Sequence, residues 1–181
     1  MNSGQFAVLV VAALLVFWAV GAYNRLVALR NAVAAAWQPI DEALTRRAQL
    51  LPALIGRLRA PLAAEHGALD AVLAAQALQQ TATAAVRALP LRRSGLVDCA
   101  SAEATLASAP ARLLALLEQH SALATETELA QGVLELREIE QRLAFARRWF
   151  NDAAQAYDSA IAHLPTRLLV RWFGFSATGR L

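Results

Sequence analysis

The sequence contains no lysine and a single cysteine, and its charge and cysteine content limit the partners and covalent cross-links that can be expected. All 17 basic residues are arginine, and against 14 acidic residues they leave a net charge of only +3. A charge this small, without a patch of mixed aromatic and basic residues, gives no reason to expect nucleic acid as a partner. Because Cys99 has no second cysteine, an internal disulfide and a cysteine-based metal site are excluded. We interpret Cys99 as a structural thiol.

Signals of β-strands and of catalytic chemistry are equally scarce. No alternating run of β-branched residues bounded by turn residues occurs, whereas Ala and Leu, strong helix formers, are abundant. None of the three histidines has a second histidine at the spacing of a zinc-binding helix. No Gly-rich phosphate loop, Glu-x-x-His pair or nucleophile motif occurs. We therefore predict an all-α protein that is not an enzyme, with no catalytic residue, cofactor or metal.

A long uncharged apolar run lies near the start of the chain. Residues 6–23 read FAVLVVAALLVFWAVGAY, and at about 1.5 Å per residue they span roughly 27 Å, close to the thickness of a hydrocarbon core. A cleaved signal peptide is the alternative, but residues 1–5 carry no basic residue, whereas Arg25 and Arg30 follow the run directly. We therefore predict that residues 1–23 are a transmembrane anchor. The positive-inside rule then places the N-terminus outside and the remainder in the cytoplasm.

Residues 24–164 carry the pattern of an antiparallel up-down four-helix bundle with long first and last helices. In those two segments apolar residues recur at alternating steps of three and four, the spacing of a heptad seam. Proline, together with the turn at 91–95, marks the boundaries between segments, and short connections favour antiparallel neighbours. The expected helices cover about 24–58, 61–89, 101–119 and 125–163.

Charged residues interrupt both seams. If the first and last helices run antiparallel, with residue 24 beside residue 164, Arg47 faces Glu140 and Asp41 faces Arg147. We therefore predict two partly buried structural ion pairs, Arg47–Glu140 and Asp41–Arg147. Such pairs fix the register of two helices more than they add stability, because desolvation offsets their attraction. The alternative is a ligand-binding or catalytic site made of the same four charges.

The same topology returns residues 91–95 and a C-terminal tail, residues 165–181, to the membrane. The tail mixes arginine with large aromatic residues, as interfacial segments do, and each arginine near anionic headgroups contributes about 1 kcal/mol. The alternative is that the tail only covers the open end of the bundle core. The residues expected at the membrane interface are Arg25, Arg30, Arg92, Arg93, Arg167, Arg171, Trp172 and Phe173.

Two stretches of the sequence carry a family resemblance. Residues 23–31 read YNRLVALRN and residues 143–152 read LAFARRWFND, with Phe-Gly-Phe at 173–175. Together these motifs resemble the LemA family, closely over 23–59 and 128–175 and weakly between. The chain departs from the family pattern at Gln49 and Asp158, and also at Ala53.

The resemblance implies a bacterial membrane protein with an N-terminal anchor and a four-helix bundle, and it implies no established activity, cofactor or catalytic residue. Together with the residues, it favours a non-enzymatic single-pass scaffold or adaptor of the bacterial cytoplasmic (inner) membrane. Its expected partners are the lipid bilayer, copies of itself, and membrane or envelope proteins, a membrane protease among them. The alternative is a sensor that binds a small ligand between helices and signals by helix repacking. A pocket with unpaired charges would favour the sensor, and mutual pairing of those charges the scaffold.

Overall fold

The computed structural model describes residues 3–119, 126–163 and 173–181, and every regular element in these ranges is helical. The expected all-α class is thus confirmed. Two helices are long, as expected, and they are the first and the last. The elements are α1 (Ser3–Leu58), the 3₁₀ turn η1 (Ala63–Glu65), α2 (His66–Ala88), α3 (Arg93–Leu106), α4 (Ser108–Gln119) and α6 (Thr127–Ala162).

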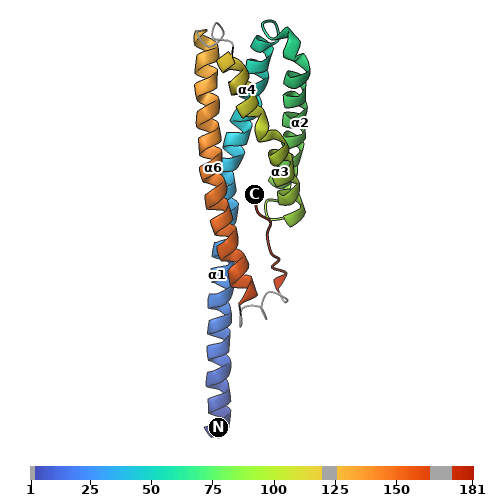
Figure 1. Ribbon diagram of the computed structural model, residues 1–181. Helices are drawn as coiled ribbons and strands as arrows, with labels where there is room; N and C mark the ends of the chain where they lie inside the picture. Colours follow the sequence, from blue (N-terminus) through green and yellow to red (C-terminus); the bar gives the residue numbers. More distant parts are fainter. Residues whose placement is uncertain (1–2, 120–125, 164–172) are drawn as a thin grey trace.

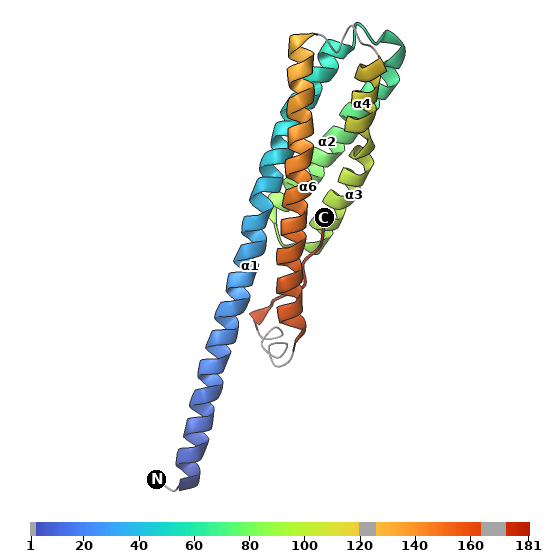
Figure 2. The ribbon, with the colours of Figure 1, turned by 60° about the vertical axis from the view of Figure 1, so that its left-hand side comes forward.

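Helices α1 and α6 lie side by side over most of the length of α6, and α2 lies beside α3 (Figures 1 and 2). Contacts show that α1 and α6 run in opposite directions. Trp37 on α1 lies edge-on to Phe150, with ring centroids 6.3 Å apart. Further along α1, Arg47 contacts Glu140. Residue numbers therefore increase along α1 in the direction in which they decrease along α6.

Two proline positions explain where the shorter helices end and begin. Pro90 lacks an N–H and follows the last turn of α2, whose Leu89 N–H bonds to the carbonyls of Ala85 and Val86. The chain then enters α3 at Arg93, so the expectation of a turn through Gly95 and a helix from about 101 is wrong. The first turn of a helix needs no intrahelical N–H bonds, which allows it to begin this soon after the proline.

Pro110 accounts for the second boundary. A proline ring clashes with the carbonyl four residues earlier, and that residue is Leu106, the last of α3. Helix α4 restarts at Ser108. The sequence predicts that Pro110 bends or splits the third helix, and the structure has two helices there, α3 and α4.

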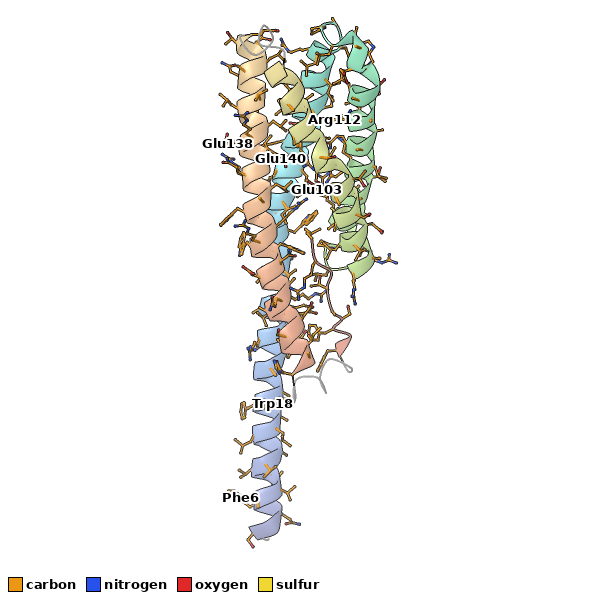
Figure 3. All side chains as sticks on the ribbon, in the orientation of Figure 1. Phe6, Trp18, Glu103, Arg112, Glu138 and Glu140 are labelled. Carbon is orange, nitrogen blue, oxygen red and sulfur yellow. The ribbon has the colours of Figure 1, made fainter. Side chains whose placement is uncertain are left out.

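The N-terminal part of α1 projects beyond the other helices, with Phe6 and Trp18 on its surface (Figure 3). An 18-residue window in this helix has a mean hydropathy of 2.5, and none of it is buried within the protein. By length and composition it can cross a membrane. Burial begins at Leu26, the first α1 residue inside the bundle core.

The bundle has two hydrophobic clusters stacked along its axis. The cluster nearer the apolar helix contains Trp37 and Phe150 and extends to Leu44 on α1. The distal cluster begins at Leu51 on α1 and includes Leu136 on α6. Each cluster contains large aliphatic side chains from at least three helices, whose burial is the dominant favourable contribution to folding.

The described part of the C-terminal tail packs on the bundle between α3 and α6 (Figure 1). The Leu181 N–H donates to Asn151 Oδ1 at 3.0 Å, and Asn151 Nδ2 donates back to the Leu181 carbonyl at 2.7 Å. A Cβ added to Gly179 would lie 2.7 Å from the Leu96 Cβ, so the tail approaches α3 too closely for a larger residue. Residues 178–181 thus pack against α3 and α6.

Candidate functional site

A layer of polar side chains separates the two hydrophobic clusters. On each of four helices, polar residues lie between the apolar residues that belong to one hydrophobic cluster and those that belong to the other. Figure 3 shows Glu103 on α3 and Glu140 on α6 at similar heights. We call this set the polar layer; its members are Arg47 from α1, Gln76, Gln79 and Thr83 from α2, Glu103 from α3, and Glu140 and Arg147 from α6.

Arg47 lies at the centre of the polar layer, with an exposed fraction of 0%. Its guanidinium group faces the Glu103 carboxylate with both terminal nitrogens: Nη1 donates to Oε1 at 2.8 Å and Nη2 donates to Oε2. Nη1 also donates to Glu140 Oε1 at 3.0 Å. This two-pronged geometry is the strong form of an arginine–carboxylate pair. The structure therefore brings Arg47 and Glu140 together, but the shorter contact is to Glu103.

The second predicted pair, Asp41 with Arg147, does not form. Arg147 Nη2 lies 2.8 Å from Glu103 Oε1, and the Asp41 carboxylate instead accepts from Arg87 Nε at 2.6 Å. The expectation considered only the first and last helices, whereas α2 and α3 supply nearer partners of opposite charge. Arg87 also donates to Thr45 Oγ1 at 2.6 Å, which ties α2 to α1 beside the polar layer.

Sequence reasoning missed Glu103, although a signal for it was present. It lies seven residues after Leu96 and three before Leu106, both of which are fully buried. A heptad pattern across 93–106 would have placed this carboxylate on the apolar seam of its helix. The expected helix began too late, at about residue 101, for that pattern to be visible.

The charges of the polar layer balance: two arginines meet two glutamates. Burial lowers the pKa of Arg147, and the nearby charge of Arg47 lowers it further. Glu103 lies between the two arginines and neutralises this repulsion. Removing one member would leave an uncompensated charge in the core, which costs far more than the net stability of the pair.

Helix α2 adds neutral polar groups to the layer. Gln79 Nε2 donates to Thr83 Oγ1 at 2.8 Å, and the Thr83 hydroxyl donates to the Gln79 carbonyl at 2.9 Å. Arg47 Nε and Gln76 Oε1 are buried without a hydrogen-bond partner among the described residues. These two atoms are the unsatisfied polar positions of the layer.

Cys99 borders the polar layer, and its thiol chemistry gives a testable expectation. Burial raises the pKa of the Cys99 thiol above 9.0, an effect that the hydrogen-bonding Thr83 side chain and the charges of Arg147 and Arg47 partly offset. In the native protein at pH 8, we expect Cys99 to react with a thiol reagent roughly tenfold or more slowly than an exposed cysteine. Labelling of the wild type beside a Cys99→Ala/Ser101→Cys control measures the ratio, and equal rates would contradict it.

The same pKa shift predicts how stability depends on pH. The unfolded thiol releases its proton near pH 9.0 and the folded thiol releases it at higher pH. The stabilisation that the protonated Cys99 thiol contributes to the folded state is therefore fully present below the unfolded pKa. It is lost as the pH rises through about 9 and above. Urea unfolding between pH 7 and 10 should show this decline in the wild type and a smaller decline in Cys99→Ala.

The bundle has a further feature on its outer surface, apart from the buried polar layer. A groove of ≈ 430 Å³ runs between α1 and α6, and its lining includes Pro39 and Ala43 on one side and Phe145 and Trp149 on the other. The aromatic side chains have exposed fractions of 72% and 49%. We call this feature the α1–α6 groove. Large exposed aromatic residues that cluster beside a groove are typical of protein-interaction surfaces.

The predicted membrane-interface residues fall into two groups. Arg25, Arg30, Arg92 and Arg93 are all exposed, and Arg30 and Arg92 line one hollow, at the end of the bundle from which the apolar helix projects. Phe173 lies against Tyr23, with ring centroids 5.1 Å apart. Arg167, Arg171 and Trp172 lie outside the described residues.

Within the described ranges, no group of three His, Cys, Asp or Glu residues could hold a metal ion.

These features define a class: in its described residues the protein is all-helical, with one helix long and apolar enough to cross a membrane and a bundle that contains a buried cluster of paired charges. The LemA family model matches residues 36–180, which is most of the chain. The chain therefore belongs to the LemA family. A search of curated proteins finds no match.

Proposed function

We propose that the protein is a non-enzymatic, single-pass scaffold or adaptor of the bacterial cytoplasmic membrane. Residues 1–23 anchor it, and residues 24–164 form an up-down four-helix bundle on the cytoplasmic side. The bundle binds membrane or envelope proteins, or copies of itself. Fixing such a surface in two dimensions raises the effective concentration of anything it binds.

The observation that carries this proposal is the α1–α6 groove. Phe145 and Trp149 lie one turn apart on α6 and stay exposed, although Phe150 next to them is fully buried. Charged side chains, Glu42 and Arg46 on α1 and Arg142 on α6, line the groove beside its apolar residues. A groove whose lining combines apolar and charged residues fits the apolar face and flanking charges of an amphipathic helix.

The pairing within the polar layer supports the scaffold over a ligand sensor. The charges of Arg47, Glu140 and Arg147 are paired with one another or with Glu103, and the charge of Asp41 is paired with Arg87. The observation that favours the sensor is a hollow of ≈ 280 Å³ beside the layer, lined in part by Thr45, Gln79, Thr83 and Arg87. It is smaller than most ligand pockets, so the sensor remains the second candidate.

Proximity labelling in native membranes tests the proposal, with the labelling enzyme inserted after Ala60. A fusion after Leu181 would disturb the contacts of that residue with Asn151. We expect the double variant Phe145→Ser/Trp149→Ser to lose its labelled neighbours, or its self-association, at least about tenfold, because truncating central aromatic residues commonly costs more than 2 kcal/mol.

The matched control carries Leu78→Ser and Val97→Ser, which remove exposed apolar side chains from α2 and α3. This control should keep the neighbours of the wild type. Identical labelling by wild type, groove variant and control would remove the support for a scaffold that acts through the α1–α6 groove.

A further inference from the structure

A hollow lies where the apolar helix meets the bundle. It measures ≈ 720 Å³ and is bounded by α1 from Trp18 to Leu29 and by the end of α6 from Ala156 to His163. We call it the membrane-end hollow. If residues 1–23 cross the bilayer, this hollow opens at the level of the lipid headgroups.

The lining of this hollow passes from apolar to polar where α1 leaves the apolar segment. Trp18, Gly21 and Ala22 line the part that belongs to that segment, and Arg25 and His163 line the next level along the axis. A phospholipid with its acyl chains beside the first level would place its phosphate at the second. Tryptophan is also the residue preferred at the depth where these two regions meet.

Small residues leave the space that a bound lipid needs. A Cβ added to Gly21 would meet no atom within 4 Å, so a larger side chain there would enter the apolar half. Ala156 and Ala160 line the part of the hollow nearer the bundle.

The charge at the polar half has no carboxylate to neutralise it among the described residues. Arg25 is exposed and makes no ion pair within 4.0 Å in the described ranges, unlike Arg87, which pairs with Asp41. A guanidinium group donates to phosphate oxygens in the same two-pronged way as to a carboxylate. His163 adds a further nitrogen at the same end.

We propose that the membrane-end hollow binds one anionic phospholipid from the surrounding leaflet, with its phosphate on Arg25 and His163 and its glycerol and proximal acyl region against Trp18, Gly21 and Ala22. This inference rests on the anchor in the proposed function. It goes beyond general attraction to an anionic surface, because it assigns a single lipid to a defined site. The lipid would hold the end of α6 at a fixed depth relative to α1.

Native mass spectrometry of the full chain, released from detergent after incubation with phosphatidylglycerol, tests the site. We expect the wild type to retain one phosphatidylglycerol in preference to phosphatidylcholine. Arg25→Gln should lower retention by about tenfold, the effect of losing one charge-assisted contact. Gly21→Leu should lower it comparably without changing any charge, because its side chain fills the apolar half.

Arg92→Gln is the matched control, since it removes the same charge from the membrane end of the bundle but lies in a separate hollow. It should retain lipid as the wild type does. Millimolar inorganic phosphate should not displace the lipid, and displacement would identify a free-phosphate site instead. If Arg25→Gln and Arg92→Gln lowered the retention of phosphatidylglycerol equally, the proposal would be overturned and only general electrostatic attraction would remain.

A separate arm distinguishes failure of this site from failure of the anchor. Full-length protein in native membranes is washed with alkaline carbonate. Protein that stays in the membrane but retains no selective lipid contradicts the lipid site alone. Protein that the wash removes contradicts the anchor, and with it both proposals.

Discussion

Replacement of Arg47 by alanine should lower the free energy of unfolding by about 3–5 kcal/mol, the usual cost of removing one partner from a buried ion pair. The change leaves the Glu103 carboxylate in the core with only Arg147 as a counter-charge, and it leaves a void where the fully buried arginine stood. Urea denaturation of the full chain in detergent micelles, followed by circular dichroism, measures the loss.

Two comparisons make that result specific to the polar layer. Arg57→Ala removes an arginine from the same helix whose partners, Glu126 and Glu128, are exposed, and it should cost less than about 1 kcal/mol. The double variant Arg47→Leu/Glu103→Leu should recover part of the loss, because apolar residues of similar volume often replace a buried pair without penalty. A loss below about 1 kcal/mol for Arg47→Ala would mean that water reaches the layer.

Phe150→Ala should also cost about 3–5 kcal/mol, the usual range for truncating a buried phenylalanine. The ring is fully buried and lies edge-on to Trp37 in the cluster that joins α1 to α6. Equilibrium unfolding of the variant and the wild type under identical conditions gives the difference.

The control for Phe150→Ala is Phe145→Ala, on the same helix and with the same change of side chain. Phe145 is 72% exposed, so its truncation should change stability by no more than about 0.5 kcal/mol. The pair separates the two roles of aromatic residues on α6: Phe150 stabilises the bundle and Phe145 is available to a partner. Similar losses in both variants would contradict this division.

The long helices could be predicted from sequence because each carries its own signal. The uncharged run at 6–23 and the heptad seams of α1 and α6 are local patterns that packing reinforces. The register that placed Arg47 opposite Glu140 also follows from these two seams alone. Such features need no knowledge of the rest of the chain.

The partners of the remaining charges could not be found in the same way. Glu103 lies between Arg47 and Arg147 only because α3 packs against α1 and α6 at that height. The Asp41 carboxylate pairs with Arg87 because α2 places Arg87 Nε 2.6 Å from Asp41 Oδ1. These contacts depend on how two weakly patterned, Ala-rich helices are placed, and periodicity within each helix does not specify that placement.

The α1–α6 groove escaped sequence reasoning for a different reason. Phe145 and Trp149 lie off the heptad seam of α6, which runs through Leu143 and Phe150, so the seam alone places them on the outside of that helix. What the seam does not show is that Pro39 and Ala43 of α1 lie beside them and complete a groove. The groove is therefore a property of the fold, and it is the property on which the proposed function rests.

The most direct test of a membrane-anchored scaffold is photo-cross-linking in native membranes from a reactive residue placed at Phe145, with Leu78 as the control position. The account predicts a discrete adduct from position 145, either with one membrane or envelope protein or with a second copy of the chain. That adduct should be lost in Trp149→Ser and absent from position 78. No adduct from position 145, or the same adducts from both positions, would contradict the account.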